Sequence, residues 1–231
     1  MTGLLKRVFY QDEPQYLAFM LSLVLLLVGQ SAFEPTGLVA RLIDITFLIL
    51  FITTFFAVWH NLWMLILVVL LGLPMFGFRV LVTIFDVTPF TTVGYAFGAL
   101  FFGFMFVSII YHILMTSRVT RNTIYGAVAA YLLIGISFAF VYGIVLQFEP
   151  DSMAIPEIPG IEMISLREAF NILTYYSFTS LTTLGFGDIS PVLPLVRTLS
   201  YLEAALGQLY LTILIARLVG LHISGGHSGS K

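Results

Sequence analysis

The chain has 231 residues, of which 59% are hydrophobic and 10% are charged, and its formal net charge is −2. Because water-soluble domains carry about 25% charged residues, this composition predicts a protein of the lipid bilayer and argues against nucleic-acid binding. The absence of cysteine excludes disulfides, thiolate catalysis and cysteine-ligated metals. No residue pattern typical of a membrane-embedded catalytic site is present, so we do not expect an enzyme.

The hydrophobic runs predict six membrane-spanning helices, since about 20 apolar residues are needed to cross the hydrocarbon core. Pro14 follows two acidic residues and favours a helix start for the first span. The end of the third span stays open, because Pro74 lies inside its apolar run and could kink or end the helix. The first four spans are expected at residues 15–33, at 42–59, from 62 onward and at 91–115.

The fourth span lacks the charges of a voltage sensor. A sensor carries arginine at every third position, since each elementary charge moved is worth about 2.3 kcal/mol per 100 mV. Between Thr91 and Met115 there is no lysine or arginine. Arg118 and Arg121 lie in the following linker, where we interpret them as interfacial anchors. The protein is therefore not expected to be steeply voltage-gated.

The second half of the chain predicts a fifth span at residues 124–148, a re-entrant segment and a sixth span at residues 193–221. Ser165 and Glu168 form a Ser-x-x-Glu capping box, which predicts a helix that begins there and runs towards Leu181. At about 15 residues this helix is too short to cross the bilayer. We therefore expect it to enter and leave the membrane on the same side.

Six spans place both termini on one side and an acidic, proline-rich loop over residues 149–165 on the other. Basic residues in short connections favour the cytoplasmic side, so we expect a multi-pass protein of the cell (cytoplasmic or inner) membrane with cytoplasmic termini. The basic residues concerned are Lys6, Arg7, Arg118, Arg121 and Arg217. The expected domains are a four-span N-terminal membrane domain (residues 1–121), a second membrane domain (122–223) that holds the fifth span, the re-entrant segment and the sixth span, and a flexible tail (224–231).

Two stretches are similar to the selectivity filter of an ion channel, TTVGYAFG at residues 91–98 and TTLGFGD at residues 182–188. Filter carbonyls replace the water shell of the ion, and turning successive carbonyls the same way requires left-handed steps that glycine permits. Gly185 and Gly187 supply such steps at alternate positions, whereas the first stretch has Ala96 in place of a second glycine. We therefore expect the first stretch to open the fourth span, and the chain to carry one filter.

One filter loop supplies one carbonyl to each layer of ligands, so a ring of carbonyls needs several copies around an axis. We expect four identical chains to supply that ring as a homotetramer. The expected partners are the lipid bilayer, the permeant ion and further copies of the chain, without nucleic acid and without a cofactor.

Residues 148–221 resemble the pore domain of tetrameric potassium channels, in particular bacterial members with a single pore loop per chain. The resemblance is carried by TTLGFGDISP, with YYSFTSL before it and EAALGQLY after it. The first four spans match this family only in number and placement. The resemblance implies an all-α membrane protein of six transmembrane helices, with a re-entrant pore helix and filter between the fifth and sixth, in a fourfold assembly. It also implies passive, potassium-selective conduction.

The resemblance further implies roles for individual residues. An aspartate behind the outer mouth should bond to an aromatic residue of the pore helix, for which Tyr175 and Tyr176 are both candidates. Gly207 is interpreted either as a gating hinge or as a site of close helix packing. Potassium is expected at Thr183, Leu184, Gly185 and Phe186, with Gly187 at the outer mouth, Thr182 and Asp188 as filter support, and Gly207, Gln208, Leu211 and Ile215 at the cavity and gate.

Two departures from the family pattern keep other functions open. Phe186 stands where tyrosine is commonest, and Leu184 replaces the usual valine or isoleucine. A weakly selective cation channel is therefore an alternative, and a non-conducting membrane subunit or receptor with a pore-like fold is another. The gating stimulus, and whether the gate lies at the filter or at the helix bundle, stay open.

Glu203 is an acidic residue in the middle of the sixth span. Ionisable residues within membrane spans are costly and usually have a reason. We interpret it as filter support, bonded to the pore helix or to the fifth span. The alternative is a protonated or hydrogen-bonded acid with a purely structural role.

Overall fold

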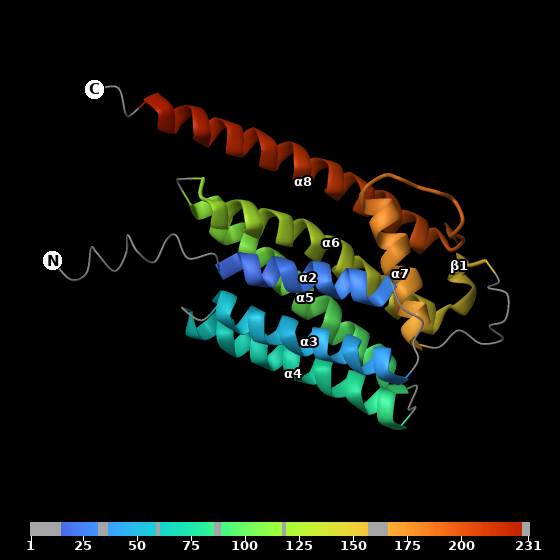
Figure 1. Ribbon diagram of the computed structural model, residues 1–231. Helices are drawn as coiled ribbons and strands as arrows, with labels where there is room; N and C mark the ends of the chain where they lie inside the picture. Colours follow the sequence, from blue (N-terminus) through green and yellow to red (C-terminus); the bar gives the residue numbers. More distant parts are fainter. Residues whose placement is uncertain are drawn as a thin grey trace. The chain divides into compact units, whose positions relative to one another are not determined.

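The computed structural model describes residues 15–31, 37–58, 61–85, 89–116, 119–156 and 166–227. Within these ranges the chain forms seven α-helices, a short 3-10 helix and a two-stranded ribbon (Figure 1). In chain order the elements are α2 (Gln15–Ser31), α3 (Gly37–Val58), α4 (Leu62–Phe85), α5 (Pro89–Met115), α6 (Arg121–Phe148), η1 (Pro150–Ser152), β1 (Met153–Ala154), α7 (Leu166–Leu181), β2 (Ser190–Pro191) and α8 (Pro194–His227).

The fold is predominantly helical, as predicted, and each predicted span contains a helix. Three helices are long and apolar enough to cross a membrane, namely Thr91–Met115, Arg121–Phe148 and Pro194–Arg217. Shorter apolar helices cover Tyr16–Gly29, Ile45–Val58 and Leu62–Phe78. Three candidate membrane spans are therefore established among the described residues, and the prediction of six stays a prediction.

Several predicted boundaries can be compared with the helices. Pro74 does not end the third span, because α4 continues through it to Phe85. The last helix continues to His227, three residues past the predicted start of the tail at Ser224. α7 begins at Leu166, next to the predicted cap. Lys6, Arg7, Arg118, Ser165 and residues 228–231 lie outside the described residues.

The chain divides into two compact units, and several helices contribute residues to both. Unit 1 contains residues 1–65, 106–131 and 211–231, and unit 2 contains residues 66–105 and 132–210. Unit 1 therefore holds α2, α3 and the final part of α8, while unit 2 holds α7 and the loop that follows it.

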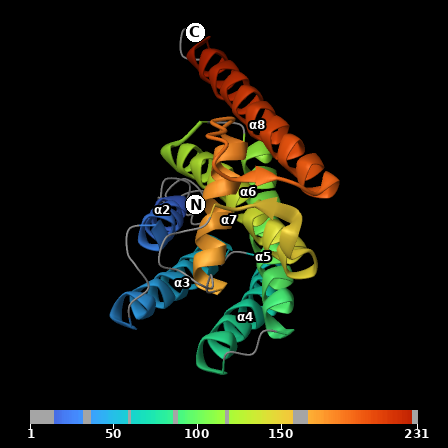
Figure 2. The ribbon, with the colours of Figure 1, turned by 90° about the vertical axis from the view of Figure 1, so that its right-hand side faces the viewer.

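In unit 1, α2 and α3 pack side by side (Figures 1 and 2). Their buried faces are mainly apolar and include Phe19 and Leu23 of α2 and Leu50 of α3. The backbone N–H of Tyr16 donates to Asn122 Oδ1 at 2.9 Å. This bond satisfies one of the amide donors that every helix leaves free in its first turn.

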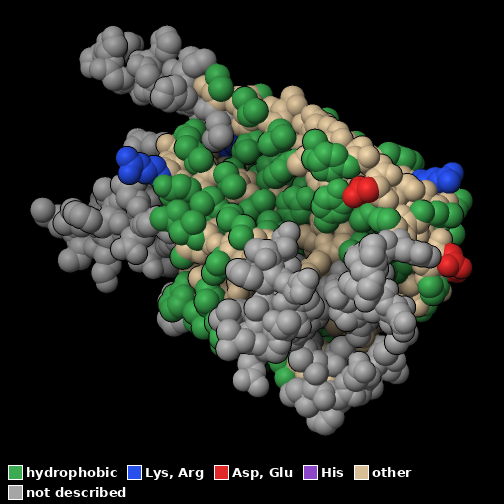
Figure 3. Space-filling model, turned by 45° about the vertical axis from the view of Figure 1, so that its right-hand side comes forward, with side chains coloured by type: hydrophobic (Ala, Val, Ile, Leu, Met, Phe, Trp, Pro, Cys, Tyr) green, Lys and Arg blue, Asp and Glu red, His purple; other side chains and the backbone are tan. Residues whose placement is uncertain are grey.

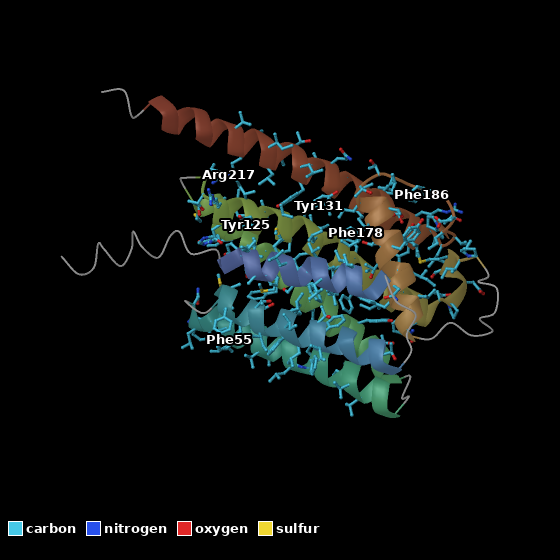
Figure 4. All side chains as sticks on the ribbon, viewed as in Figure 1. Phe55, Tyr125, Tyr131, Phe178, Phe186 and Arg217 are labelled. Atoms are coloured by element: carbon cyan, nitrogen blue, oxygen red, sulfur yellow. The ribbon has the colours of Figure 1, made fainter. Side chains whose placement is uncertain are left out.

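Arg217, near the end of α8, binds the C-terminal end of α5 within unit 1 (labelled in Figure 4). Its Nη2 lies 3.1, 2.6 and 3.2 Å from the carbonyl oxygens of Ile113, Leu114 and Thr116. The last carbonyls of a helix lack helical partners and carry partial negative charge. A guanidinium placed there therefore satisfies these oxygens and links α8 to α5.

In unit 2, aromatic rings fill the space between α5, α6 and α7. The ring of Phe140 lies 5.4 Å from that of Phe102 and 4.5 Å from that of Phe170, measured between centroids. Gly135 of α6 admits the ring of Phe178, since an added Cβ would lie 2.8 Å from it. These contacts hold α7, which is too short to span a bilayer, against α6.

We predict that Arg217→Gln loosens the last turn of α5. Hydrogen bonds to a charged group are worth about 1.5–3 kcal/mol each, so local amide exchange there should rise at least about tenfold. Hydrogen exchange read by mass spectrometry on peptides from α5 measures this effect. Arg121→Gln is the matched control, because it removes the same charge from an exposed side chain. Equal exchange in both variants would show that Arg217 does not cap the helix.

Candidate functional site

The loop that leaves α7 is folded back onto the last turn of that helix. The carbonyl oxygen of Thr179 accepts hydrogen bonds from the backbone N–H of Leu184 at 2.9 Å and of Gly185 at 3.2 Å. The terminal carbonyls of α7 are thus partly satisfied by the loop itself. The loop therefore starts in a fixed position relative to the helix that precedes it.

The backbone of this loop takes a left-handed step at every second residue. The φ angles are 58° at Thr183, 52° at Gly185 and 79° at Gly187. The sequence predicted such steps at the two glycines. It missed the third step, at Thr183, where a side chain makes a left-handed conformation cost about 1–2 kcal/mol. The period of two, continued backwards from the glycines, is the signal that would have located it.

The hydroxyl of Thr183 is held on two sides. It donates to the carbonyl oxygen of Thr182 at 2.6 Å and accepts from Gln208 Nε2 at 3.2 Å. Gln208 belongs to α8 and is exposed. The predicted cavity residue therefore contacts the predicted innermost residue of the filter, while Leu211 and Ile215 are exposed further along the same helix.

The C-terminal end of the loop is attached to α7 through Tyr175. Its hydroxyl donates to Asp188 Oδ2 at 2.8 Å, and this hydrogen bond raises the pKa of the tyrosine. Its ring also stacks on Phe186, with centroids 6.3 Å apart and an interplanar angle of 4°. Phe186 is labelled in Figure 4. Of the two candidate aromatic partners of Asp188, the structure thus selects Tyr175.

Tyr176 points instead into the interior of unit 2. Its hydroxyl lies 2.5 Å from Ser200 Oγ on α8, and its side chain is buried. Neighbouring tyrosines of α7 therefore bind different partners, since successive side chains on a helix point in directions about 100° apart. One supports the outer end of the loop, and the other joins α7 to α8.

Glu203 is fully buried and is bonded to both expected helices, α6 and α7. Oε2 accepts a hydrogen bond from the Tyr142 hydroxyl of α6 at 2.7 Å. Oε1 makes a short hydrogen bond with Ser177 Oγ of α7. The sequence predicted the acid but not its hydroxyl partners, because isolated serine and tyrosine residues in apolar helices give no distinctive pattern.

Gly207 marks a close approach between α8 and the end of α7. A Cβ added at Gly207 would collide with the backbone carbonyl oxygen of Leu181. Of the two interpretations offered by the sequence, the geometry favours close packing. Leu181 is the last residue of α7, so this contact lies at the point in the chain where the loop begins.

The other filter-like stretch, residues 91–98, is helical and lies within α5. Gly98 of this stretch faces the ring of Phe140, so the small residue serves helix packing. The expectation that residues 91–98 open the fourth span agrees with this structure. The loop at residues 182–188 is the one that departs from helical geometry.

A comparison with family models matches residues 130–222 to a family described as an ion channel. The match covers 93 of 231 residues and contains the loop at residues 182–188. This match supports the interpretation of the chain as an ion channel. Comparisons with curated proteins and with solved structures gave no significant match. Together with the long apolar helices, the family match supports a membrane protein that lets ions pass passively.

We predict that Gly207→Ala destabilises unit 2 by about 1–3 kcal/mol, the cost of forcing an extra methyl into a packed contact. Gly220→Ala on the same helix is the matched control, because an added Cβ there meets no atom within 4 Å. Both changes improve helix propensity by a similar amount, so their difference isolates the contact. Thermal unfolding in detergent measures it, and equal transition temperatures would contradict close packing at Gly207.

Proposed function

We propose that the protein is a potassium channel that conducts passively through the loop at residues 182–188. The observation that carries the proposal is the left-handed step at every second residue, at Thr183, Gly185 and Gly187. Alternating steps turn successive carbonyls to the same side, as needed to replace the water shell of a bare cation. The resemblance of this loop to potassium filters supplies the choice of ion.

We propose a homotetramer. All residues from 182 to 188 are exposed in the single chain. Only 11% of the most apolar stretch of the candidate span in α8 is buried, whereas 56% of the corresponding stretch in α6 is buried. Figure 3 shows hydrophobic side chains over much of one face, with few charged ones. Lipid and neighbouring copies would cover such surfaces. Four loops around an axis would supply the oxygen rings that one loop lacks.

In this assembly the individual residues have distinct roles. The carbonyls of Leu184, Gly185 and Phe186 and both oxygens of Thr183 would bind potassium, and the negative C-terminal end of α7 would favour a cation below them. Gly187 completes the outer mouth. Thr182, Asp188 and Tyr175 support the loop from outside, and Tyr176 and Glu203 support it from behind.

The membrane arrangement is part of the proposal. The hydrophobic runs and the positions of the basic residues in the sequence support six spans with both termini in the cytoplasm, and a four-span N-terminal domain (residues 1–121) before the pore domain (122–223). In α5 the described side chains include no lysine or arginine, which agrees with conduction that is not steeply voltage-dependent. Gln208, Leu211 and Ile215 would line the cavity and gate.

A weakly selective cation channel is the alternative that a specific observation favours. Phe186 has no hydroxyl, and its ring is held by stacking on Tyr175. Stacked rings can slide in their plane, whereas a hydrogen bond fixes both distance and direction. The width of the filter would then be less tightly defined than in tyrosine-containing filters.

We predict that the purified protein in liposomes gives potassium flux that barium, a divalent ion of similar radius, blocks. Gly185→Ala should abolish the flux, because alanine pays about 1–2 kcal/mol at a φ of 52° in each of four copies. Gly103→Ala in α5 is the control, since an added Cβ there meets no atom within 4 Å.

The outcomes of this experiment separate the candidate functions. Absence of flux from correctly assembled wild-type protein would favour a non-conducting subunit. Flux with a reversal potential that does not follow potassium in mixed potassium and sodium would favour a weakly selective channel. Flux that survives Gly185→Ala would place the pathway elsewhere.

We predict that Tyr175→Phe lowers the potassium-to-sodium permeability ratio about fivefold to tenfold, the effect of one lost hydrogen bond of about 1–1.5 kcal/mol. The variant removes the bond to Asp188 but keeps the ring that stacks on Phe186. Tyr111→Phe is the matched control, because that hydroxyl lies on an exposed side chain of α5. An unchanged ratio in Tyr175→Phe would show that the bond does not contribute to selectivity.

A further inference from the structure

The cluster around Glu203 fixes the position of a proton. Ser177 Oγ contacts two oxygen atoms, the carbonyl oxygen of Gly135 at 2.7 Å and Glu203 Oε1. A serine hydroxyl has one hydrogen and can donate it to one of them. A backbone carbonyl can only accept. The second contact of Ser177 therefore needs a hydrogen from the other partner.

An ionised Glu203 leaves one of these contacts without a hydrogen. Both neighbours of Ser177 would then be acceptors. One of the two oxygen–oxygen contacts would have no hydrogen between its atoms, and the two lone pairs would repel each other in a buried position. A protonated Glu203 removes the conflict. Oε1–H donates to Ser177 Oγ, and Ser177 Oγ–H donates to Gly135, while Oε2 still accepts from Tyr142.

The surroundings of Glu203 give a second, independent argument. Its polar partners are hydroxyl groups from α6 and α7, and among the residues that the structure describes no basic side chain pairs with it. The other titratable group close by is Tyr176 of α7, which bonds to Ser200. Burying a carboxylate without a cation is far more costly than burying a hydrogen-bonded neutral acid.

We propose that Glu203 is a neutral carboxylic acid that donates a hydrogen bond to Ser177, and that the resulting chain from α8 through α7 to α6 positions the filter loop. The chain ends at the Gly135 carbonyl on one side and receives the Tyr142 hydroxyl on the other. Ser177 lies six residues before Thr183, so the bond holds α7 close to the loop. The role in conduction rests on the proposed channel function, and the protonation does not.

Infrared spectroscopy of the full-length protein in lipid tests the protonation without any need for conduction. At neutral pH we expect a carboxylic-acid C=O band that shifts in deuterated buffer and is lost in Glu203→Gln. Ser177→Ala should shift this band, because it removes the acceptor. Asp188→Asn is the control and should leave the band in place. A missing band in the wild type, or a band that Ser177→Ala does not move, would overturn the proposal.

Ion selectivity tests the positioning role. Glutamine mimics a neutral acid, since its NH₂ group can donate to Ser177 and its oxygen can accept from Tyr142. Glu203→Leu has neither group. Glu203→Leu therefore loses two buried hydrogen bonds, to Ser177 and to Tyr142. We expect its permeability ratio to fall at least about tenfold below that of Glu203→Gln, since leaving even one buried group unpaired produces about that factor.

Both variants are first checked for assembly by size-exclusion chromatography. If Glu203→Leu does not assemble, Tyr142→Phe and Ser177→Ala replace it, because each removes one bond of the chain. Equal ratios in assembled Glu203→Gln and in the variants that break the chain would overturn the positioning role. If the wild type carries the infrared band but gives no flux, the protonation stands and the channel function fails.

Discussion

The central constraint on this structure is a stretch of backbone that follows neither a helix nor a sheet. Between Thr183 and Gly187 the chain alternates in handedness, so successive carbonyls cannot pair as they would in a helix or a sheet. In a bilayer such backbone persists only where protein or water surrounds it. Side chains of α7 and α8 contact this loop at Asp188 and Thr183, and its exposed residues need neighbouring chains, ions or water.

A loop with unpaired carbonyls must be held by contacts from outside its own backbone, and these contacts come from three directions. At the inner end Gln208 holds the hydroxyl of Thr183, and at the outer end Tyr175 holds Asp188. Behind the loop, Glu203 joins α7 to its two neighbouring helices. Each contact reaches the loop either directly or through α7, so the stiffness of that short helix determines how well the carbonyls are placed.

The sequence predicted the elements that follow from hydrophobic period, capping and glycine spacing. It located α7 and its loop, the helical nature of residues 91–98 and the left-handed steps at Gly185 and Gly187. It did not predict the left-handed Thr183, because threonine itself does not favour that conformation and the period of two set by the glycines was its one signal. Nor could it predict that Arg217 caps α5, since the two lie about 100 residues apart and a cation near a helix end has many possible partners.

The contact between Gly207 and Leu181 joins α8 to the end of α7. Leu181 ends α7 and leads into the loop, whereas α8 continues from Gly207 towards Arg217. Because an added Cβ at Gly207 would collide with the carbonyl oxygen of Leu181, the missing side chain is what lets α8 come this close to the start of the loop. The geometry thus favours packing over a hinge at this position, and a displacement of α8 here would have to displace Leu181 as well.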